Sequence, residues 1–218
     1  MTVGMNEKDM ARRAAMEIRD GFCVNLGIGM PTLVLDFVPI DKTVFFHTEN
    51  GLLGMGAFAG KGEAHPDLVD AAKQPVTYIK GASFFPSDVS FAMIRGGHID
   101  LAIMGAYQVS GSGDLANWTA QGMMPSVGGA MDIVVGIKRI IVMMMHTTKD
   151  GRPKIVKSLT YPVTGFRCVS MIVTNLCVID VTDKGLVLKE LSPGVSVKDV
   201  MESTEADMVV PEGLRSTP

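Results

Sequence analysis

A single carboxylate, Glu49, lies in a run of glycine and large apolar residues, "HTENGLLGMGAF" at positions 47 to 58. An acid at the end of a strand ordinarily faces water, whereas this one is followed by Asn50-Gly51 and then by Gly54 and Gly56. Glycines let the backbone approach another group closely. The stretch indicates either a hairpin turn, for which Asn-Gly is well suited, or a site where Glu49 meets a substrate.

Three glycine-rich segments follow expected strands, the third at some distance: "LGIGMP" (26–31), "ENGLLGMG" (49–56) and "VGGAMD" (127–132). In open α/β sheets, ligands bind beyond the carboxyl ends of strands, and glycine there lets backbone N–H groups approach an anion. Each segment alone has a structural explanation, and "GIG" lacks the full GxGxxG pattern of dinucleotide sites. Together, with a lone carboxylate in one of them, they favour a functional site.

The elements that would position these segments alternate between helices and strands. Apolar periodicity and glycine or proline boundaries predict helices at 6–20, 29–38, 87–97, about 130–137 and 196–204, and strands at 22–29, 43–49, 75–81, 99–109, 138–146, 154–159, 168–175, 176–182 and 185–191. This order predicts an α/β fold with a single open, mostly parallel sheet flanked by helices. The close spacing of the last strands indicates that part of the sheet is antiparallel. We expect one domain, residues 1–218, with a long polar loop at 57–74.

Composition excludes several classes of function. The chain has 218 residues, 47% of them hydrophobic, and a formal net charge of −3 without a Lys/Arg cluster, so we expect a substantial core and no nucleic-acid partner. No segment has the length and apolarity of a signal peptide or a membrane span. Three cysteines without a CxxC pair indicate reduced thiols. We therefore expect a soluble, cytoplasmic protein in which most of the 17 methionines fill the core.

Other polar residues have structural as well as functional interpretations. His47 precedes Glu49 by two positions, and strand alternation would place both side chains on one face, where His47 either orients the acid or is structural. Asn25 in an apolar strand needs partners and either pins a turn or supports the catalytic loop. No histidine, including His65, His98 and His146, shares a metal-ligand spacing with Cys or Asp, so no metal is expected. No Gly-x-Ser-x-Gly motif occurs, and a serine or thiol hydrolase is disfavoured.

Five segments together resemble a known family: "NLGIGMPT", "TENGLLGMG", "FAMIRGGHIDLAIMGA", "GDLANW" and "VGGAMDIVVG". They are similar to the B (beta) subunits of bacterial 3-oxoacid CoA-transferases, a group that includes succinyl-CoA:acetoacetate, acetate/acetoacetate and 3-oxoadipate CoA-transferases. The resemblance runs from about residue 6 to about residue 207. It implies the CoA-transferase fold, which is related to that of sugar-phosphate isomerases.

The resemblance also implies roles for individual residues. The family nucleophile is the glutamate of a Ser-Glu-Asn-Gly motif, which falls on Glu49, with Thr48 at the serine position. The backbone oxyanion donors would fall on Gly129 and Ala130. The remaining glycine-turn residues would contact substrate or CoA: Gly27, Gly29, Asn50, Gly51 and Gly128.

The chemistry of such a site needs no metal and no permanently bound cofactor, because CoA is a substrate carried on Glu49. A carboxylate attacks an acyl-CoA thioester, giving an acyl-glutamyl anhydride and then a glutamyl-CoA thioester. Water must be excluded, and we expect Leu52, Leu53, Met55 and Phe58 to frame the acid. The resemblance implies an A (alpha) subunit as partner, in a heterotetramer of two A and two B subunits, with acyl-CoA and 3-oxoacid substrates.

Two other hypotheses are left open. One is a catalytically silent binding subunit that keeps the fold, against which the intact Glu49, Gly51 and Gly129 argue. The other is an enzyme like the sugar-phosphate isomerases, which would need a basic phosphate cradle and an acid/base pair. Neither feature is found in the glycine turns.

Overall fold

The structure is a computed structural model that describes residues 4–120 and 127–216. The helices are α1 (Glu7–Ala15), the 3-10 helix η1 (Met30–Phe37), α2 (Ser87–Arg95), α3 (Ala130–Gly136) and α4 (Val197–Glu202). The strands are β1 (Cys23–Leu26), β2 (Phe45–Thr48), β3 (Leu52–Phe58), β4 (Val76–Phe84), β5 (Leu101–Met104), β6 (Gln108–Ser110), β7 (Leu115–Ala116), β8 (Ile140–Met143), β9 (Ile155–Val156), β10 (Val169–Val173), β11 (Cys177–Thr182), β12 (Gly185–Leu191), β13 (Met208–Val209) and β14 (Arg215–Ser216).

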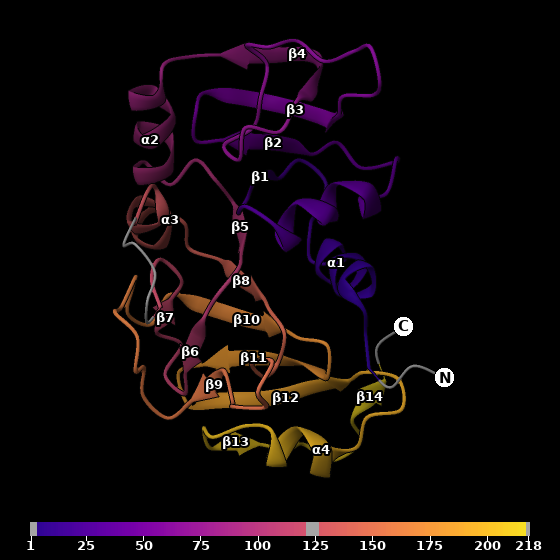
Figure 1. The fold of residues 1–218 in the computed structure, drawn as a ribbon, viewed down its shortest axis with the longest axis vertical. Helices are drawn as coiled ribbons and strands as arrows, with labels where there is room; N and C mark the ends of the chain where they lie inside the picture. The colour runs from indigo at the N-terminus through magenta and orange to yellow at the C-terminus, as the bar shows by residue number, and fades with distance from the viewer. Residues whose placement is uncertain (1–3, 121–126, 217–218) are drawn as a thin grey trace.

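An 11-stranded sheet runs through the molecule in the order β13-β12-β11-β10-β8-β5-β1-β2-β3-β4, with β14 paired to β12 (Figure 1). Strands β2, β1, β5, β8 and β10 are parallel to their neighbours in this central part. The chain turns antiparallel at β2-β3-β4 and at β10-β11-β12. The predicted α/β class with a mostly parallel sheet is confirmed, as is the antiparallel part.

Each face of the central sheet buries its own hydrophobic core. Alternate residues of a strand point to opposite faces, so Leu101 and Ile103 of β5 pack on the face that α1 and η1 cover. Ala102 and Met104 pack on the opposite face, with α2 and α3. Because both faces are covered, β5 and β8 are apolar throughout, as expected for strands inside a parallel sheet.

Helix α1 begins as the sequence predicts and ends sooner. The Asn6 side chain accepts from the Asp9 N–H at 3.0 Å, and the Asp9 carboxylate accepts from the Asn6 N–H, which forms a capping box. The helix ends at Ala15, because the N–H groups of Glu17 and Ile18 donate to carbonyls three residues back, which tightens the chain into turns. Helix α4, expected at 196–204, begins with a capping box formed by Ser196 and Asp199.

Several predicted elements differ in the structure. Residues 30–37 form a 3-10 helix that Gly29 introduces at φ +86°. The strand expected at 99–109 divides at Gly105 into β5 and β6, and β6 belongs to a separate three-stranded sheet, β7-β6-β9. Both halves are buried, so apolarity alone could not indicate the break. The glycine-rich turn at 49–56 is shorter than expected, because β3 begins at Leu52, and the strand expected at 154–159 is reduced to the two residues of β9.

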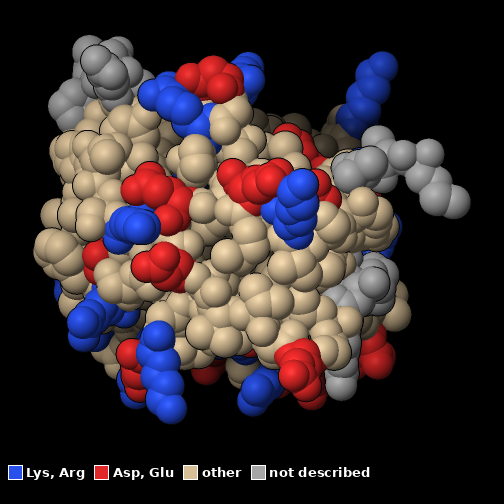
Figure 2. All heavy atoms as spheres, turned by 90° about the horizontal axis from the view of Figure 1, so that it is seen from below, with Lys and Arg blue, Asp and Glu red and all other residues tan. Residues whose placement is uncertain are grey.

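Charged side chains of both signs are interspersed on the face that carries α4 and β13, at the lower end of Figure 1 (Figure 2). On that face no continuous basic patch is seen. Among the residues described, no helix is both long and apolar enough to cross a membrane.

Candidate active site

Glu49 is presented by a three-residue turn between β2 and β3. The Gly51 N–H donates to the Thr48 carbonyl at 3.1 Å, and Thr48 pairs with Leu52 in the antiparallel register. Gly51 has φ +112°, and a side-chain Cβ there would lie 1.8 Å from the Phe85 carbonyl oxygen. Only glycine fits this position. The Thr48 hydroxyl accepts from the Leu52 N–H at 3.3 Å, so threonine supplies a hydroxyl contact within the turn.

The Glu49 carboxylate is partly buried and has one side-chain donor among the described residues. Burial raises the pKa of Glu49, and the nearby Asp70 adds to the increase, whereas the hydrogen bond from Asn25 opposes it. That bond joins Asn25 Nδ2 to Glu49 Oε1 at 2.9 Å. A desolvated carboxylate is a stronger nucleophile than a hydrated one once it is ionised, and the amide fixes its direction.

A chain of buried polar groups extends behind this carboxylate. Asn25 of β1 is in register with His47 of β2, and its Nδ2 lies 3.4 Å from His47 Nδ1. On the other side of the ring, His47 Nε2 lies 2.9 Å from the Ser90 hydroxyl of α2, which itself donates to the Thr48 carbonyl at 3.0 Å. Since that hydroxyl proton is already used, His47 Nε2 carries the hydrogen and Nδ1 accepts from Asn25.

Burial lowers the pKa of His47 to about 4, so the ring is neutral near pH 7. No hydrogen bond joins His47 to Glu49 among the described residues, but the same Asn25 Nδ2 atom is in reach of both side chains, and both residues border one small crevice. The histidine reaches the acid through Asn25. Asn25 is fully buried, and its Oδ1 has no partner among the described residues, so the Nδ2 contacts alone orient the amide.

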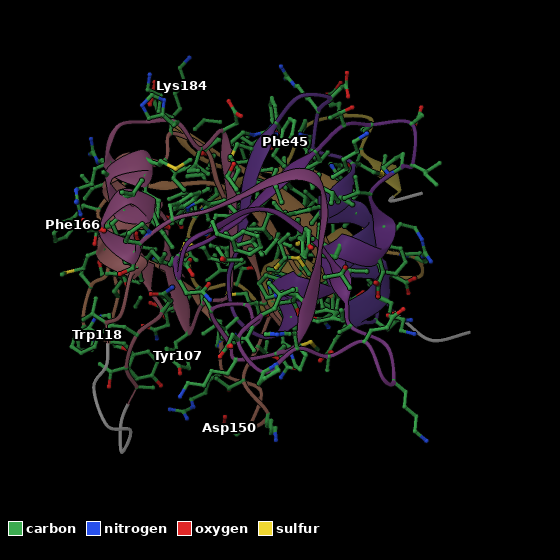
Figure 3. The ribbon with its side chains drawn as sticks, turned by 90° about the horizontal axis from the view of Figure 1, so that it is seen from above. Phe45, Tyr107, Trp118, Asp150, Phe166 and Lys184 are labelled. Atoms are coloured by element: carbon green, nitrogen blue, oxygen red, sulfur yellow. The ribbon has the colours of Figure 1, made fainter. Side chains whose placement is uncertain are left out.

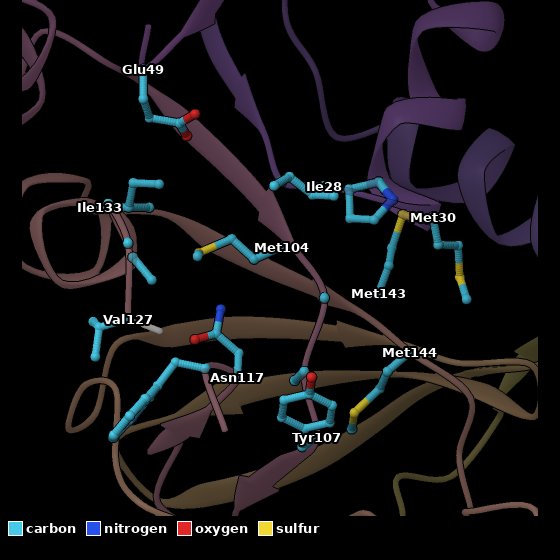
Figure 4. A pocket seen from close by; sticks show the side chains of 18 of the residues that line it. Ile28, Met30, Glu49, Met104, Tyr107, Asn117, Val127, Ile133, Met143 and Met144 are labelled. Atoms are coloured by element: carbon cyan, nitrogen blue, oxygen red, sulfur yellow. The ribbon is translucent and has the colours of Figure 1, made fainter. Parts of the chain in front are cut away.

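Glu49 lies at one end of a hollow of about 630 Å³, with Ile28 and Met104 beyond it and Asn117 and Tyr107 at the far end (Figure 4). Tyr107 and Trp118, which both line the hollow, lie on the same side of the molecule (Figure 3). The described lining residues are Gly27, Ile28, Met30, Pro31, Glu49, Met104, Gly105, Ala106, Tyr107, Asn117, Trp118, Val127, Gly128, Gly129, Ala130, Ile133, Met143, Met144, Met145 and Lys154.

The structure brings together five of the residues that the sequence singles out: Glu49, Gly27, Gly128, Gly129 and Ala130 all line this hollow. Gly51, Gly29 and Asn50 do not. The Asn50 side chain instead donates to the Val69 carbonyl at 2.7 Å, which ties the turn to the long loop. The catalytic and binding roles of all eight residues stay predictions.

Gly129 packs directly against the nucleophile candidate. A Cβ on Gly129 would lie 3.5 Å from Glu49 Cγ and 2.8 Å from a ring carbon of Phe91. The Ala130 N–H donates to the Val127 carbonyl at 3.3 Å, whereas the Gly129 N–H has no backbone acceptor among the described residues. Of the two predicted oxyanion donors, Gly129 has the more available N–H group.

The apolar frame around Glu49 differs from the expected one. Leu52, Leu53 and Phe58 do not line the hollow, and Met55 borders only a small crevice beside Glu49. The reason is that these residues belong to β3, where they pair with β2 and β4. Methionines from other segments form the frame instead: Met30, Met104, Met143, Met144 and Met145. Met104, Met143 and Met144 are also buried in the core, as expected for most methionines.

The lining residues that the sequence did not single out include two with polar side chains, Tyr107 and Lys154. Tyr107 follows the break after β5, and Lys154 precedes β9, so neither belongs to a glycine turn. Within the described ranges, no group of three or more His, Cys, Asp or Glu side chains could hold a metal ion. The three cysteines are free thiols.

The fold is that of the CoA-transferases. An acyl-CoA transferase apoenzyme from Escherichia coli O157:H7 superimposes with a TM-score of 0.78 at 20% identity, over 100% of this chain and 45% of that chain. The sequence relatives are more similar. The B subunit of the 3-oxoadipate CoA-transferase of Acinetobacter baylyi is 47% identical over 207 residues, which cover 94% of this chain and 95% of the relative.

A second relative is the B subunit of a probable succinyl-CoA:3-ketoacid coenzyme A transferase of Bacillus subtilis, which is 49% identical over 95% of this chain and 96% of its own length. The family model for coenzyme A transferases matches residues 7–203. The chain belongs to the coenzyme A transferase family.

Proposed function

We propose that this chain is the B subunit of a two-subunit CoA-transferase and that Glu49 is its nucleophile. The enzyme would move CoA between an acyl-CoA such as succinyl-CoA or acetyl-CoA and a 3-oxoacid such as acetoacetate or 3-oxoadipate. The observation that carries the proposal is the placement of Glu49, a desolvated carboxylate held by Asn25 at one end of a hollow and packed against Gly129.

The proposed reaction begins when a Glu49 oxygen attacks the acyl-CoA thioester carbonyl and CoA thiolate leaves, giving an acyl-glutamyl anhydride. The thiolate then attacks the glutamyl carbonyl, the donor acid departs as its carboxylate, and a glutamyl-CoA thioester remains. The acceptor carboxylate attacks that thioester and releases the thiolate again. Finally the thiolate attacks the acceptor acyl carbonyl, which forms the new acyl-CoA and restores Glu49.

Each of these additions places negative charge on a carbonyl oxygen. The Gly129 N–H, close to Glu49, is the group we assign to stabilise that charge, and one such donor contributes about 3 kcal/mol in comparable sites. The anhydride and the thioester both hydrolyse in water, so a hollow framed by Met104, Met143 and Ile133 favours transfer over hydrolysis.

The partner subunit is part of the proposal. Both bacterial relatives are named as B subunits, which supports an A subunit as the partner, and we retain a heterotetramer of two A and two B subunits as the expected assembly. The cytoplasmic location is likewise retained, and the free cysteines agree with it.

The test is co-expression with an A subunit followed by incubation with acyl-CoA. A CoA-sized mass increase is expected on the peptide that contains Glu49, and the variant Glu49→Gln should lack it on first exposure and lose at least about 1000-fold in transfer rate, as covalent nucleophiles do. Glu202→Gln, an exposed acid of α4, is the matched control and should behave as wild type. An active complex without any adduct at Glu49 would refute the mechanism, and an inactive complex would favour the silent binding subunit.

A further inference from the structure

The hollow contains one charged side chain besides Glu49 among its described lining residues, the cation Lys154. Lys154 immediately precedes β9 of the small sheet, and its backbone N–H donates to the His146 carbonyl at 3.1 Å. The other described lining residues are apolar, glycine, or neutral polar side chains such as Tyr107 and Asn117. A hollow with one acid and one base can distinguish the two ends of a substrate.

The Lys154 ammonium has no hydrogen-bond or ion-pair partner among the described residues, whereas Lys42, Lys189 and Lys198 each have one. The side chain is largely enclosed. Burial alone lowers its pKa to about 8, with no carboxylate acting on it, so the group is still mostly charged near pH 7. A desolvated charge without a partner is unfavourable, and an anion that enters the hollow would relieve that cost.

Lys154 belongs to the end of the hollow that is remote from Glu49. Lys154 and Tyr107 also line an adjoining hollow of about 300 Å³ with Thr160 and Tyr161, which Glu49 does not reach. Figure 4 shows Glu49 and Tyr107 at opposite ends of the main hollow. The anion that pairs with Lys154 is therefore distant from the group that reacts with Glu49.

We propose that Lys154 binds the distal carboxylate of a dicarboxylic acyl group whose other carboxyl reacts at Glu49. This inference rests on the proposed function. The carboxyl that is transferred must lie at Glu49, so only a second negative group reaches Lys154. Succinyl and 3-oxoadipyl groups have one, whereas acetyl and acetoacetyl groups do not. This role of Lys154 predicts that at least one substrate of the enzyme is a dicarboxylic acid.

A phosphate of CoA is a second possible source of the anion. Phosphates are bound by several converging donors, such as backbone N–H groups together with Arg or Lys. The described lining residues place only one cation in the main hollow, which five methionines also line. Arg152 lines the adjoining hollow with Lys154, but its guanidinium is already paired with Asp150. That environment favours a single carboxylate, and the experiment separates the two sources.

The experiment measures kcat/KM of the complex with an A subunit, using succinyl-CoA and acetyl-CoA as donors. Lys154→Met keeps the length of the side chain and removes its charge, and it should lower kcat/KM for succinyl-CoA by about 10- to 100-fold, as the loss of a charged hydrogen bond does. The value for acetyl-CoA should change by less than about threefold. Lys154→Arg should retain most of the succinyl-CoA activity, because it keeps the charge.

The matched control is Lys157→Met, which removes an exposed lysine just beyond β9 and should leave both donors unaffected. Equal losses for both donors with Lys154→Met would overturn the inference and assign the residue to CoA itself. A wild-type complex that uses acetyl-CoA but no dicarboxylic acyl-CoA would overturn it too. The CoA adduct on Glu49 is measured in the same samples. If the adduct forms and one of the two contrary results is also obtained, only the role of Lys154 is overturned and the proposed function stands. If an active complex forms no adduct, the proposed function itself is refuted.

Discussion

Two histidines, His47 in β2 and His146 just after β8, are buried in almost the same way. Burial lowers the pKa of each to about 4, with a further contribution at His146 from the charge of Lys154, so both are neutral near pH 7. Each Nε2 lies 2.9 Å from a hydroxyl, that of Ser90 or of Thr204. Each of these hydroxyls donates its own hydrogen to a backbone carbonyl, so each can accept a hydrogen bond from an Nε2–H of its histidine.

The two rings differ on the Nδ1 side. His47 Nδ1 faces the Asn25 amide that holds Glu49. His146 Nδ1 faces the Thr174 hydroxyl at 2.9 Å, with Cys177 next to it, and no described carboxylate follows. The same polar arrangement therefore positions a reactive group in one place and joins β8 to the β10–β11 turn and to α4 in the other. The role of each network is therefore set by the group that the histidine Nδ1 faces, and not by the histidine itself.

The largest expected effect is on the free energy of unfolding, and it should be the same for both histidines. Each has a folded-state pKa below its ordinary value of 6.5, so the unfolded chain takes up protons that the folded chain excludes as the pH falls below 6.5. The free energy of unfolding should decrease by about 3 kcal/mol per histidine between pH 6.5 and pH 4. His47→Gln and His146→Gln should each flatten this dependence, measured by urea unfolding at several pH values.

The transfer activity of the complex should distinguish the two histidine variants. His47→Gln should alter the transfer rate of the complex, whereas His146→Gln, whose network ends without a described carboxylate, should leave kcat/KM within about threefold of wild type. Equal effects of both variants on kcat/KM at pH 7.5 would contradict the comparison.

The next effect concerns the amide between His47 and Glu49. Asn25→Leu removes the donor to Glu49 Oε1 and should lower kcat/KM by roughly 30-fold, about 2 kcal/mol, because hydrogen bonds to charged groups contribute about 1.5–3 kcal/mol. Stability should change less, since an apolar side chain replaces a buried amide whose Oδ1 has no partner among the described residues. Thermal unfolding and kinetics of the same complex measure both.

Asn175→Leu is the control for this variant, because its Oδ1 accepts from the backbone N–H of His146 at 2.8 Å, in the other network. It should reduce stability and leave kcat/KM unchanged. An Asn25→Leu complex with wild-type kinetics would show that the amide does not orient the acid.

Local rules indicated Glu49 and its turn from the sequence. A lone acid before Asn-Gly in an apolar run identifies the residue, and the positive φ of Gly51 follows from turn chemistry that acts within a few residues. The close approach of the Phe85 carbonyl, which also excludes a side chain at Gly51, comes from a distant segment. The capping boxes of α1 and α4 are equally local. The alternation of strands with helices along the sequence was sufficient to predict the α/β class of the fold.

The features of the site that the sequence did not indicate depend on contacts between distant segments. Asn25 lies 22 residues from His47, and Ser90 lies 43 residues from it, and only the parallel register of β1 and β2 brings the first two together. Lys154 enters the hollow because the chain leaves the large sheet after β5, at a break inside a nearly continuous apolar run. Spacing along the chain carries no signal for either arrangement.

The smallest expected effect tests whether the hydroxyl at the end of each network matters for chemistry. Ser90→Ala removes the acceptor for His47 Nε2–H, and the neutral ring can then move its hydrogen to Nδ1, where it opposes the Asn25 amide. We expect a loss of about fivefold in kcat/KM, near 1 kcal/mol, with a similar loss of stability. Thr204→Val removes the corresponding hydroxyl beside His146 and should cost similar stability without the kinetic loss. If Thr204→Val lowered kcat/KM as much as Ser90→Ala, the kinetic loss would reflect general loosening of the fold, because no described carboxylate lies beyond His146 to be misplaced.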